Sequence, residues 1–225
     1  AVRFPVEVVA DRPEEVVEVR DVAIQVAASS QETTQSISEL TSLAERLQDL
    51  VEEDLLSHAK SRVQSSAKEL ERVLTESVNS GRFTAGDLFD EDYQLIPDTE
   101  PKKYHTKYDR YLDQAIQSFE DALLEDSHVV YAVLTDRNGY VPTHNSRYTK
   151  PLTGDIEKDK LGNRTKRIFD DPVGLGAAHY DGADGKGYLQ QVYERDTGEK
   201  MWDISAPIFV NGRHWGGFRI GYQMD

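Results

Sequence analysis

The sequence predicts an α+β protein in which a long N-terminal coiled-coil helix is followed by a five-stranded antiparallel sheet with flanking helices. Three observations predict this class. Neither Gly nor Pro occurs between Pro13 and Gly81, apolar or small residues in that stretch recur in alternating steps of four and three, and the C-terminal part holds short β-branched and aromatic runs separated by turn residues. We expect an irregular lead at 1–13, the helix at 14–80, a loop and an amphipathic helix at 81–127, and the sheet domain at 128–225.

Charge and composition exclude several classes of protein. The chain of 225 residues carries 41 acidic and 26 basic residues, a formal charge of −15, whereas binding to nucleic acid or anionic lipid depends on clustered Lys and Arg. No run approaches the roughly 18 apolar residues that a membrane-spanning helix needs. Because the chain has no cysteine, disulfides, cysteine-ligated zinc and covalently attached c-type haem are excluded. We expect no nucleic-acid partner and no membrane segment in this chain.

The long helix is expected to begin at Pro13, which suits a first helical turn and is followed by Glu14 and Glu15 at the positive end of the helix dipole. The seam of the predicted coiled coil consists of Val19, Ala23, Val26, Ser30, Thr33, Ile37, Leu40, Ala44, Leu47 and Val51. Another helix must cover such a seam, so we expect a homodimer through this helix. After a stutter at 52–57, where we expect the packing partner to change, the seam continues through Leu56, Ala59, Val63, Ala67, Leu70 and Leu74.

The middle of the chain joins the long helix to the sheet. Gly81 is expected to end the helix, and the stretch from there to Pro101 contains further Gly and Pro, which predicts a loop with one short helical turn. A second amphipathic helix follows, because apolar residues recur at helical spacing from Tyr104 to Leu123. We expect this helix to pack on the sheet or on the long helix.

The sheet is predicted from strand patterns that are joined by hairpin turns. The five patterns run from 129 to 135, 140 to 143, 187 to 195, 201 to 210 and 214 to 222. Asn211-Gly212 is a two-residue hairpin signal, since both positions of that turn need positive φ. The long insert from Asn145 to Lys186 separates the second and third patterns, and we expect a pocket to form there.

Three segments of this region resemble a known family. Asp136–Asn145, Asn163–Phe169 and Asp203–Gly217 together resemble the PAS-like, single Cache-like sensor domain of bacterial methyl-accepting chemotaxis proteins. The resemblance implies that the predicted sheet is a PAS/Cache-like sheet that binds a small ligand. Some relatives carry covalent haem through a Cys-x-x-Cys-His motif, and that property is not carried over to a chain without cysteine.

A second segment, from Asp21 to Leu40 and on to Glu53, resembles the returning C-terminal helix of the same family's cytoplasmic signalling hairpin. Together the two resemblances imply a cytoplasmic receptor whose sensor lies C-terminal to its signalling helices. The family's kinase-contacting hairpin tip is missing from this sequence. A chemotaxis kinase and its coupling protein are therefore expected as partners only through regions that this chain lacks.

The resemblance also suggests a methylation site on the helix. Gln31 and Glu32 lie among small residues in a pattern similar to the family's methylation pattern, although Gln35 stands where a small residue is expected. Methylating Glu32 would remove a negative charge from an acidic helix bundle and tighten its packing. The alternative is that these residues belong to the solvated polar face of a coiled coil.

The candidate ligand-binding residues are cationic and aromatic side chains of the insert and the neighbouring strands. Arg164 and Arg167 lie beside Phe169 in the insert, and converging guanidinium groups can hold a carboxylate while aromatic rings cover an apolar body. A small organic acid or amino acid is the expected ligand. Alternatively, these arginines pair with neighbouring acids and only staple the insert. The further candidates are Tyr131, His144, Asn145, Arg195, Trp202 and Asp203.

The sequence lacks a catalytic or metal-binding constellation. It has no Cys nucleophile and no Gly-x-Ser-x-Gly elbow, and no two histidines stand at helical metal-binding spacing. We expect neither an enzyme nor a metal site nor a cofactor, and noncovalent haem or flavin stays open. Two functions remain: a sensory module of a bacterial chemoreceptor, or a non-sensing dimerisation or docking cap on a coiled coil.

Overall fold

The computed structural model describes residues 13–194 and 198–223, and its contacts divide the chain into two compact units that meet between Leu55 and Leu56. Helix α1 (Pro13–Asn79) begins in the first unit and ends in the second, and it starts at the predicted Pro13. The boundary lies within the stretch 52–57, where the sequence predicts a change of packing partner.

In the first unit, the described side chains of α1 are exposed from Val16 to Val51. The predicted seam is exposed with the rest, with Val19 at 70% and Leu40 at 64% of their full accessible surface. A seam of this kind needs a second helix, which a single chain does not supply. The homodimer therefore stays a prediction.

In the second unit, the rest of α1 buries the shifted seam. Ala59, Val63, Ala67, Leu70 and Leu74 are at most 3% exposed, so this part of the helix belongs to the core of the sheet domain. Burial of these side chains supplies most of the stabilisation that such a helix receives, since isolated helices are marginal in water.

The segment after α1 differs in part from the sequence prediction. The predicted short helical turn is α2 (Ala85–Leu88), which begins with a capping box between Thr84 and Asp87. The expectation of a helix from Tyr104 is wrong at its start, because β2 (Tyr104–His105) pairs with β1 (Gln94–Leu95) and the Tyr104 amide donates to the Lys166 carbonyl at 2.8 Å. The helical part consists of α3 (Asp109–Ala115), α4 (Gln117–Ala122) and the 3-10 turn η1 (Leu123–Glu125).

The main sheet is antiparallel, with the spatial order β3-β8-β7-β6. Its strands are β3 (Val129–Asp136), β6 (Leu189–Glu194), β7 (Lys200–Val210) and β8 (Arg213–Gln223). Asn211 and Gly212 both have positive φ, 51° and 77°, as the predicted β7–β8 hairpin requires. The α+β class and the succession of a long helix and an antiparallel sheet are confirmed.

The second predicted strand forms, but it does not join the main sheet. β4 (Tyr140–Val141) pairs with β5 (Arg167–Ile168) in a separate two-stranded sheet, so the main sheet has four strands rather than five. Pro142 follows β4 directly and has no N–H to continue a ladder. The insert supplies the pairing instead, with the Lys166 amide donating to the Val141 carbonyl at 2.7 Å.

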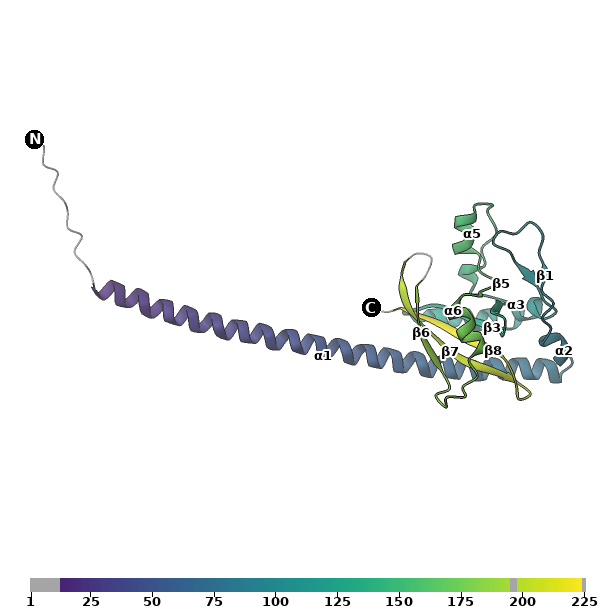
Figure 1. The fold of residues 1–225 in the computed structure, drawn as a ribbon, viewed down its shortest axis with the longest axis horizontal. Coiled ribbons are helices and arrows are strands. Elements are labelled where there is room, and N and C mark those ends of the chain that lie inside the picture. The colour runs from purple at the N-terminus through teal and green to yellow at the C-terminus, as the bar shows by residue number, and fades with distance from the viewer. Residues whose placement is uncertain (1–12, 195–197, 224–225) are drawn as a thin grey trace, which may run out of the picture. The chain divides into compact units, whose positions relative to one another are not determined.

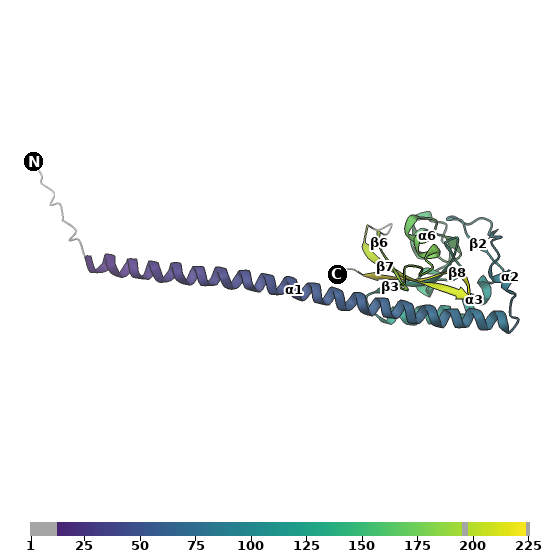
Figure 2. The same ribbon diagram turned by 60° about the horizontal axis from the view of Figure 1, so that its bottom comes forward.

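The two faces of the main sheet have different covers. α6 (Pro172–His179) lies against β8, β7 and β6 on one face, and the second-unit part of α1 runs along the other (Figures 1 and 2). The face toward α1 is apolar, with Ala132, Ile204, Phe218 and Ile220 almost completely buried. Because successive side chains of a strand point to opposite faces, the neighbours of these residues point toward the insert, which also contains α5 (Ile156–Gly162).

Candidate ligand-binding site

A small pocket lies between the insert and the face of the sheet that α6 covers. Its volume is about 30 Å³, enough for one or two water molecules, within about 330 Å³ of empty space when the mouth is included. Strands β3, β4, β6 and β8, the insert and the N-terminus of α6 supply its walls. The lining residues are Tyr131, Val133, Val141, His144, Arg164, Phe169, Asp171, Tyr193 and Arg219.

The register of the sheet places Tyr131 on the floor of this pocket. Tyr131 on β3 stands opposite Gly221 on β8, which in turn stands opposite Asp203 on β7. A Cβ atom on Gly221 would lie 2.3 Å from a ring carbon of Tyr131. The glycine therefore leaves room for the Tyr131 ring to cross β8 toward Asp203.

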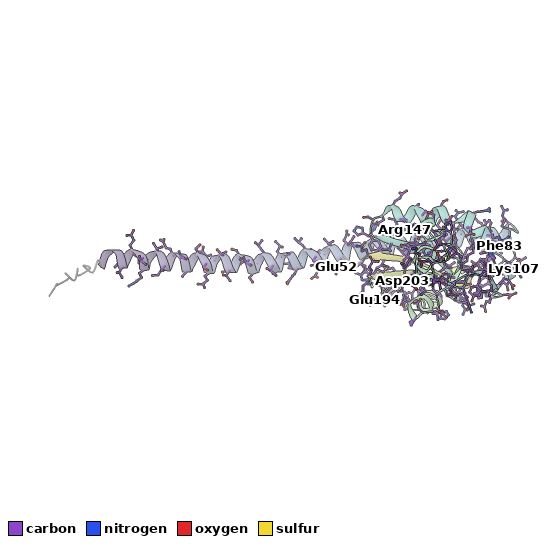
Figure 3. The ribbon with its side chains drawn as sticks, turned by 90° about the horizontal axis from the view of Figure 1, so that it is seen from above. Glu52, Phe83, Lys107, Arg147, Glu194 and Asp203 are labelled. Carbon is purple, nitrogen blue, oxygen red and sulfur yellow. The ribbon has the colours of Figure 1, made fainter. Side chains whose placement is uncertain are left out.

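Tyr131, Asp203 and Arg219 form a buried polar network. The Tyr131 hydroxyl donates to Oδ2 of Asp203, and Arg219 donates to the same oxygen from Nη2 at 2.7 Å and from Nε at 3.0 Å. Burial, and then the Asp203 carboxylate, raise the pKa of Tyr131 well above its usual value, so the hydroxyl keeps the proton that it donates. Oδ1 of Asp203 is buried without a hydrogen-bond partner. In Figure 3, Asp203 lies among the packed side chains of the sheet domain.

Two further cations surround the aromatic wall of the pocket. The guanidinium groups of Arg164 and Arg167 lie 5.2 Å and 4.9 Å from the centre of the Phe169 ring, within the range of cation–π attraction. Nη1 of Arg167 also donates to the Lys160 carbonyl at 3.1 Å, which holds β5 against the end of α5. This side of the pocket is therefore positively charged.

His144 is the buried imidazole of the pocket. It is only 4% exposed, its ring meets the rings of Tyr131 and Tyr148 edge to face at 6.4 Å and 4.9 Å, and its Nδ1 has no hydrogen-bond partner. Burial lowers its pKa well below the usual value, and the charges of Arg164, Arg219 and other arginines lower it further. The imidazole is therefore neutral at about pH 7.

Asp171 closes the pocket from the side of α6. As the N-cap of this helix it accepts hydrogen bonds from the amides of Val173 and Gly174, both at 3.0 Å. Its carboxylate thus fixes where α6 begins and brings a negative charge to the pocket wall. Tyr193 on β6 completes this side, with its ring edge to face with Tyr131 at 6.5 Å.

The structure brings several predicted residues together. Tyr131, His144, Arg164 and Phe169 all line the pocket, although only Tyr131 comes from the main sheet. Arg167 stacks on Phe169, and Asp203 lies directly behind Tyr131 and Arg219.

Other predicted residues lie elsewhere. Asn145 has a structural position, since Oδ1 accepts from the Ala132 amide at 2.9 Å and Nδ2 donates to the Glu120 carbonyl at 2.8 Å. Trp202 alternates with Asp203 along β7 and so faces away from the pocket. Arg195 lies outside the described residues. Gln31 and Glu32 are exposed on α1 in the first unit.

Sequence reasoning missed Arg219, Asp171 and Tyr193. A signal for Arg219 exists, because it is the one charged residue between Trp215 and Tyr222 on β8, and Gly217 and Gly221 stand two positions to either side of it, on the same face. A charged side chain flanked in this way points into the protein and needs a buried partner. That partner, Asp203, is also enclosed by apolar strand residues in the sequence.

Within 13–194 and 198–223, no three His, Cys, Asp or Glu side chains gather as metal ligands. Across the same ranges, no helix has the length and apolar character needed to cross a bilayer.

Comparisons with known proteins identify no family. No protein-family model matches the chain, and no curated protein matches it. Among solved structures, the chain is similar to the ligand-binding domain of Mlp24 with asparagine, at 10% sequence identity and a TM-score of 0.27. The match covers 73% of this chain and spans 60% of the length of that chain. At this identity and TM-score the match indicates neither a ligand nor a role for this chain.

Proposed function

We propose that this chain is a sensory module of a bacterial chemoreceptor, in which the pocket binds a small organic acid or amino acid and α1 transmits its occupancy. One observation carries the proposal: the main sheet has a polar pocket on one face and the second-unit part of α1 on the other. Strands β3, β7 and β8 are therefore shared between the ligand site and the helix. The family resemblance of the sequence supports the same role.

The charges of the pocket favour a ligand with a carboxylate. Arg164 and Arg219 line it and Arg167 stacks on its aromatic wall, against the carboxylates of Asp171 and Asp203. Because guanidinium groups bind carboxylates through charge-assisted hydrogen bonds, an anionic group offsets the surplus of positive charge. The apolar lining residues then receive the body of the ligand.

Contacts within the second unit connect the pocket to α1, so that binding of a ligand can affect the helix. Gln64 on α1 donates to the Lys186 carbonyl at 3.2 Å, and Lys60 lies 4.8 Å from the centre of the Tyr188 ring. Both contacts are made by the loop that follows α6, whose N-cap Asp171 lines the pocket. A ligand that prefers one position of α6 would thereby favour one set of contacts with α1.

The remaining parts of the proposal concern the helix and its partners. We propose a cytoplasmic homodimer through the exposed seam of α1, with methylation at Gln31 and Glu32 tuning the packing of the helices. A chemotaxis kinase and coupling protein would be engaged only through regions outside this chain. The pocket is proposed as a binding site rather than an active site, because its lining includes no Ser, Cys or Lys nucleophile.

Ligand-dependent thermal stability tests the proposal. Carboxylates and amino acids are screened by thermal unfolding of the whole chain, and a ligand at about 100 times its Kd should add about 2.7 kcal/mol to the free energy of unfolding. Arg164→Ala should abolish the shift, whereas the control Arg110→Ala, an exposed arginine on α3, should keep it. If no carboxylate or amino acid stabilises the wild type, the sensor proposal fails.

A non-sensing dimerisation or docking cap is the second candidate. The small volume of the pocket, about 30 Å³, favours the non-sensing cap, because a domain whose interior is filled by its own side chains needs no ligand to complete it. The two candidates differ in the same screen, since a cap predicts that neither the thermal unfolding nor the pairing of the helices responds to any small molecule. Mass spectrometry and an optical spectrum of the purified protein would also reveal a copurified ligand, haem or flavin.

A further inference from the structure

The insert has a second, larger hollow at its surface, between the 3-10 turn η2 (Ser146–Tyr148) and helix α5. Its volume is about 540 Å³, within the usual range of ligand pockets, whereas the candidate ligand-binding site has about 30 Å³. No lining residue is common to the two. We call this hollow the α5 groove, and the side chains that define it are Arg147, Tyr148, Lys150, Pro151, Lys158 and Leu161.

Hydrogen bonds fix the loop that forms one wall of the α5 groove to helix α5 itself. The two carboxylate oxygens of Asp159 accept from the Thr153 amide at 2.8 Å and 3.1 Å, and one of them also accepts from the Thr153 hydroxyl at 2.8 Å. At the end of α5, the Lys150 amide donates to the Gly162 carbonyl at 3.1 Å, and Nδ2 of Asn163 donates to the Lys150 carbonyl at 2.6 Å. The groove is therefore a preformed feature of the fold, as ligand pockets usually are.

Exposed apolar side chains are concentrated beside this groove. Leu152, Ile156 and Leu161 belong to one short segment and are 39%, 47% and 42% exposed. Elsewhere in the described part of the second unit, Leu95 and Val192 are the large aliphatic side chains with comparable exposure. Single apolar residues on a surface need no explanation, but a cluster around a groove marks a site of interaction.

The lining of the α5 groove is itself mostly apolar. Leu161 lines it from α5, Pro151 from the loop, and the ring of Tyr148 from η2. The aliphatic stem of Lys150 continues this surface across Gly162, since a Cβ atom at that glycine would lie 3.6 Å from Cδ of the lysine. A hydrocarbon tail laid in the groove therefore finds apolar contacts on both walls.

Two cations at the α5 groove have no counter-charge. In the part of the chain that the structure describes, no carboxylate lies within ion-pair distance of Arg147 or Lys150. The lining Lys158, by contrast, pairs with Asp155 at 3.0 Å. The guanidinium of Arg147 is held in place by the carbonyl of Val130, which is an uncharged acceptor. An anionic group at this position would gain charge-assisted hydrogen bonds without displacing an ion pair.

We propose that the α5 groove is a second ligand site of this chain, which binds a free, single-tailed amphiphilic anion of the fatty-acid type. The head group lies between Arg147 and Lys150, and the tail lies on Tyr148, Pro151 and Leu161. The proposal goes beyond the sensor function and does not depend on it, because the two sites share no lining residue. A bilayer is a poorer partner, since the chain carries a net charge of −15 and binding to anionic lipid takes a larger cluster of cations.

Three small probes test the ligand class. Octanoate, octan-1-ol and butyrate are titrated calorimetrically into the whole chain carrying Arg164→Ala, which disables the carboxylate site proposed for the sensor pocket. Octanoate should bind at a single site, about fivefold more tightly than octan-1-ol, because the alcohol has the same tail but forms no ion pair with the two cations. It should bind about tenfold more tightly than butyrate, because a fully buried methylene strengthens binding about fourfold and the open groove covers part of the longer tail.

Variants of the lining assign this binding to the groove. Leu161→Ser should weaken octanoate and octan-1-ol alike by about fivefold, whereas the control Ile156→Ser, at a similarly exposed residue of α5 that does not line the groove, should change neither. Lys150→Glu should lower the ratio of octanoate to octan-1-ol affinity to about one, and the control Lys102→Glu, at an exposed lysine outside the groove, should keep it. Because the ratio is measured within one variant, a general loss of stability cannot mimic its change.

Several outcomes would overturn the proposal. These are equal affinity for octanoate and octan-1-ol, binding that Leu161→Ser and Ile156→Ser weaken to the same extent, and no binding of octanoate at all. Cosedimentation with vesicles of phosphatidylcholine and phosphatidylglycerol, lost in Leu161→Ser and unaccompanied by octanoate binding, would assign the groove to a membrane surface instead. The sensor function is judged separately, since it predicts small carboxylates that bind to the wild type and not to Arg164→Ala.

Discussion

The guanidinium of Arg219 and the carboxylate of Asp203 form an ion pair across the β7–β8 ladder that is almost fully removed from solvent, with side chains 6% and 0% exposed. Both hydrogen bonds from Arg219 end on Oδ2, which also accepts the Tyr131 hydroxyl. One oxygen of Asp203 thus gathers the polar groups beneath the pocket, and the other has no partner.

Removing the cation alone should be strongly destabilising. In Arg219→Met the Asp203 carboxylate remains buried without its counter-charge, so we expect a loss of about 3–5 kcal/mol in the free energy of unfolding, measured by urea denaturation. The double variant Asp203→Asn/Arg219→Met removes both charges and should be more stable than Arg219→Met alone. If the loss in the double variant equalled the sum of the losses in Arg219→Met and Asp203→Asn, the two side chains would not be energetically coupled.

A methyl group at Gly221 should disturb the same network. The added Cβ in Gly221→Ala would lie 2.3 Å from a ring carbon of Tyr131, so the ring must leave its place beside Asp203. We expect a loss of about 1–3 kcal/mol in unfolding free energy from this overpacking, together with a changed near-UV circular dichroism spectrum of the tyrosines. Gly86→Ala is the matched control, because the nearest atom to its Cβ would be 3.5 Å away and alanine favours the helix α2. Equal losses in the two variants would contradict the role of Gly221.

The buried carboxyl of Glu120 on α4 should make stability depend on pH. Burial raises the pKa of this group well above 4.5, and Oε1 accepts the Leu134 amide at 3.0 Å while Oε2 has no partner. The folded state therefore keeps a proton that the unfolded state loses above about pH 4.5. The contribution of Glu120 to the free energy of unfolding is therefore complete below about pH 4.5, and it is lost as the pH rises toward the folded-state pKa.

Glu120→Gln should remove this dependence, because glutamine has the shape of the neutral acid and does not titrate. We expect the variant to match the wild type in urea denaturation at about pH 4 and to exceed it by about 1 kcal/mol or more at about pH 7. The control Glu125→Gln changes a carboxyl in the neighbouring turn η1. A wild-type advantage at the higher pH would mean that Glu120 is charged in the folded protein.

The sequence predicted those parts of the fold that depend on local pattern. The uninterrupted helix from Pro13, the shift of its seam near Leu56 and the Asn211-Gly212 hairpin all follow from spacing or turn chemistry within a few residues. Pairing between distant segments did not follow. Tyr104 has helical spacing with its neighbours, yet its amide bonds to Lys166, more than sixty positions further along the chain.

The candidate site shows the same limit. Phe169 and Arg164 were predicted because they are neighbours in the sequence, whereas Arg219 and Asp171 reach the pocket only through the register of β8 and the position of α6. Trp202 illustrates the sensitivity to register, since a shift of one residue along β7 exchanges it with Asp203. Knowledge of the strand pairing would have excluded it.

The proposed dimer can be tested by cross-linking, because the chain has no cysteine and a single introduced thiol reports only on itself. Leu40 belongs to the predicted seam and is 64% exposed in the single chain, whereas Ser42 lies outside the seam on the same turn of α1. In a parallel coiled coil the two copies of a seam residue face each other, within reach of a disulfide. Mild oxidation of Leu40→Cys should therefore give a disulfide-linked dimer on a non-reducing gel, and Ser42→Cys should stay mostly monomeric.

If signalling passes through this seam, a ligand that stabilises the sheet domain should also change the rate of cross-linking at Leu40→Cys, because filling the pocket would then alter the packing of the helices. Equal yields from both variants, with a monomer in analytical ultracentrifugation, would contradict the dimer and remove the element that is proposed to carry the signal.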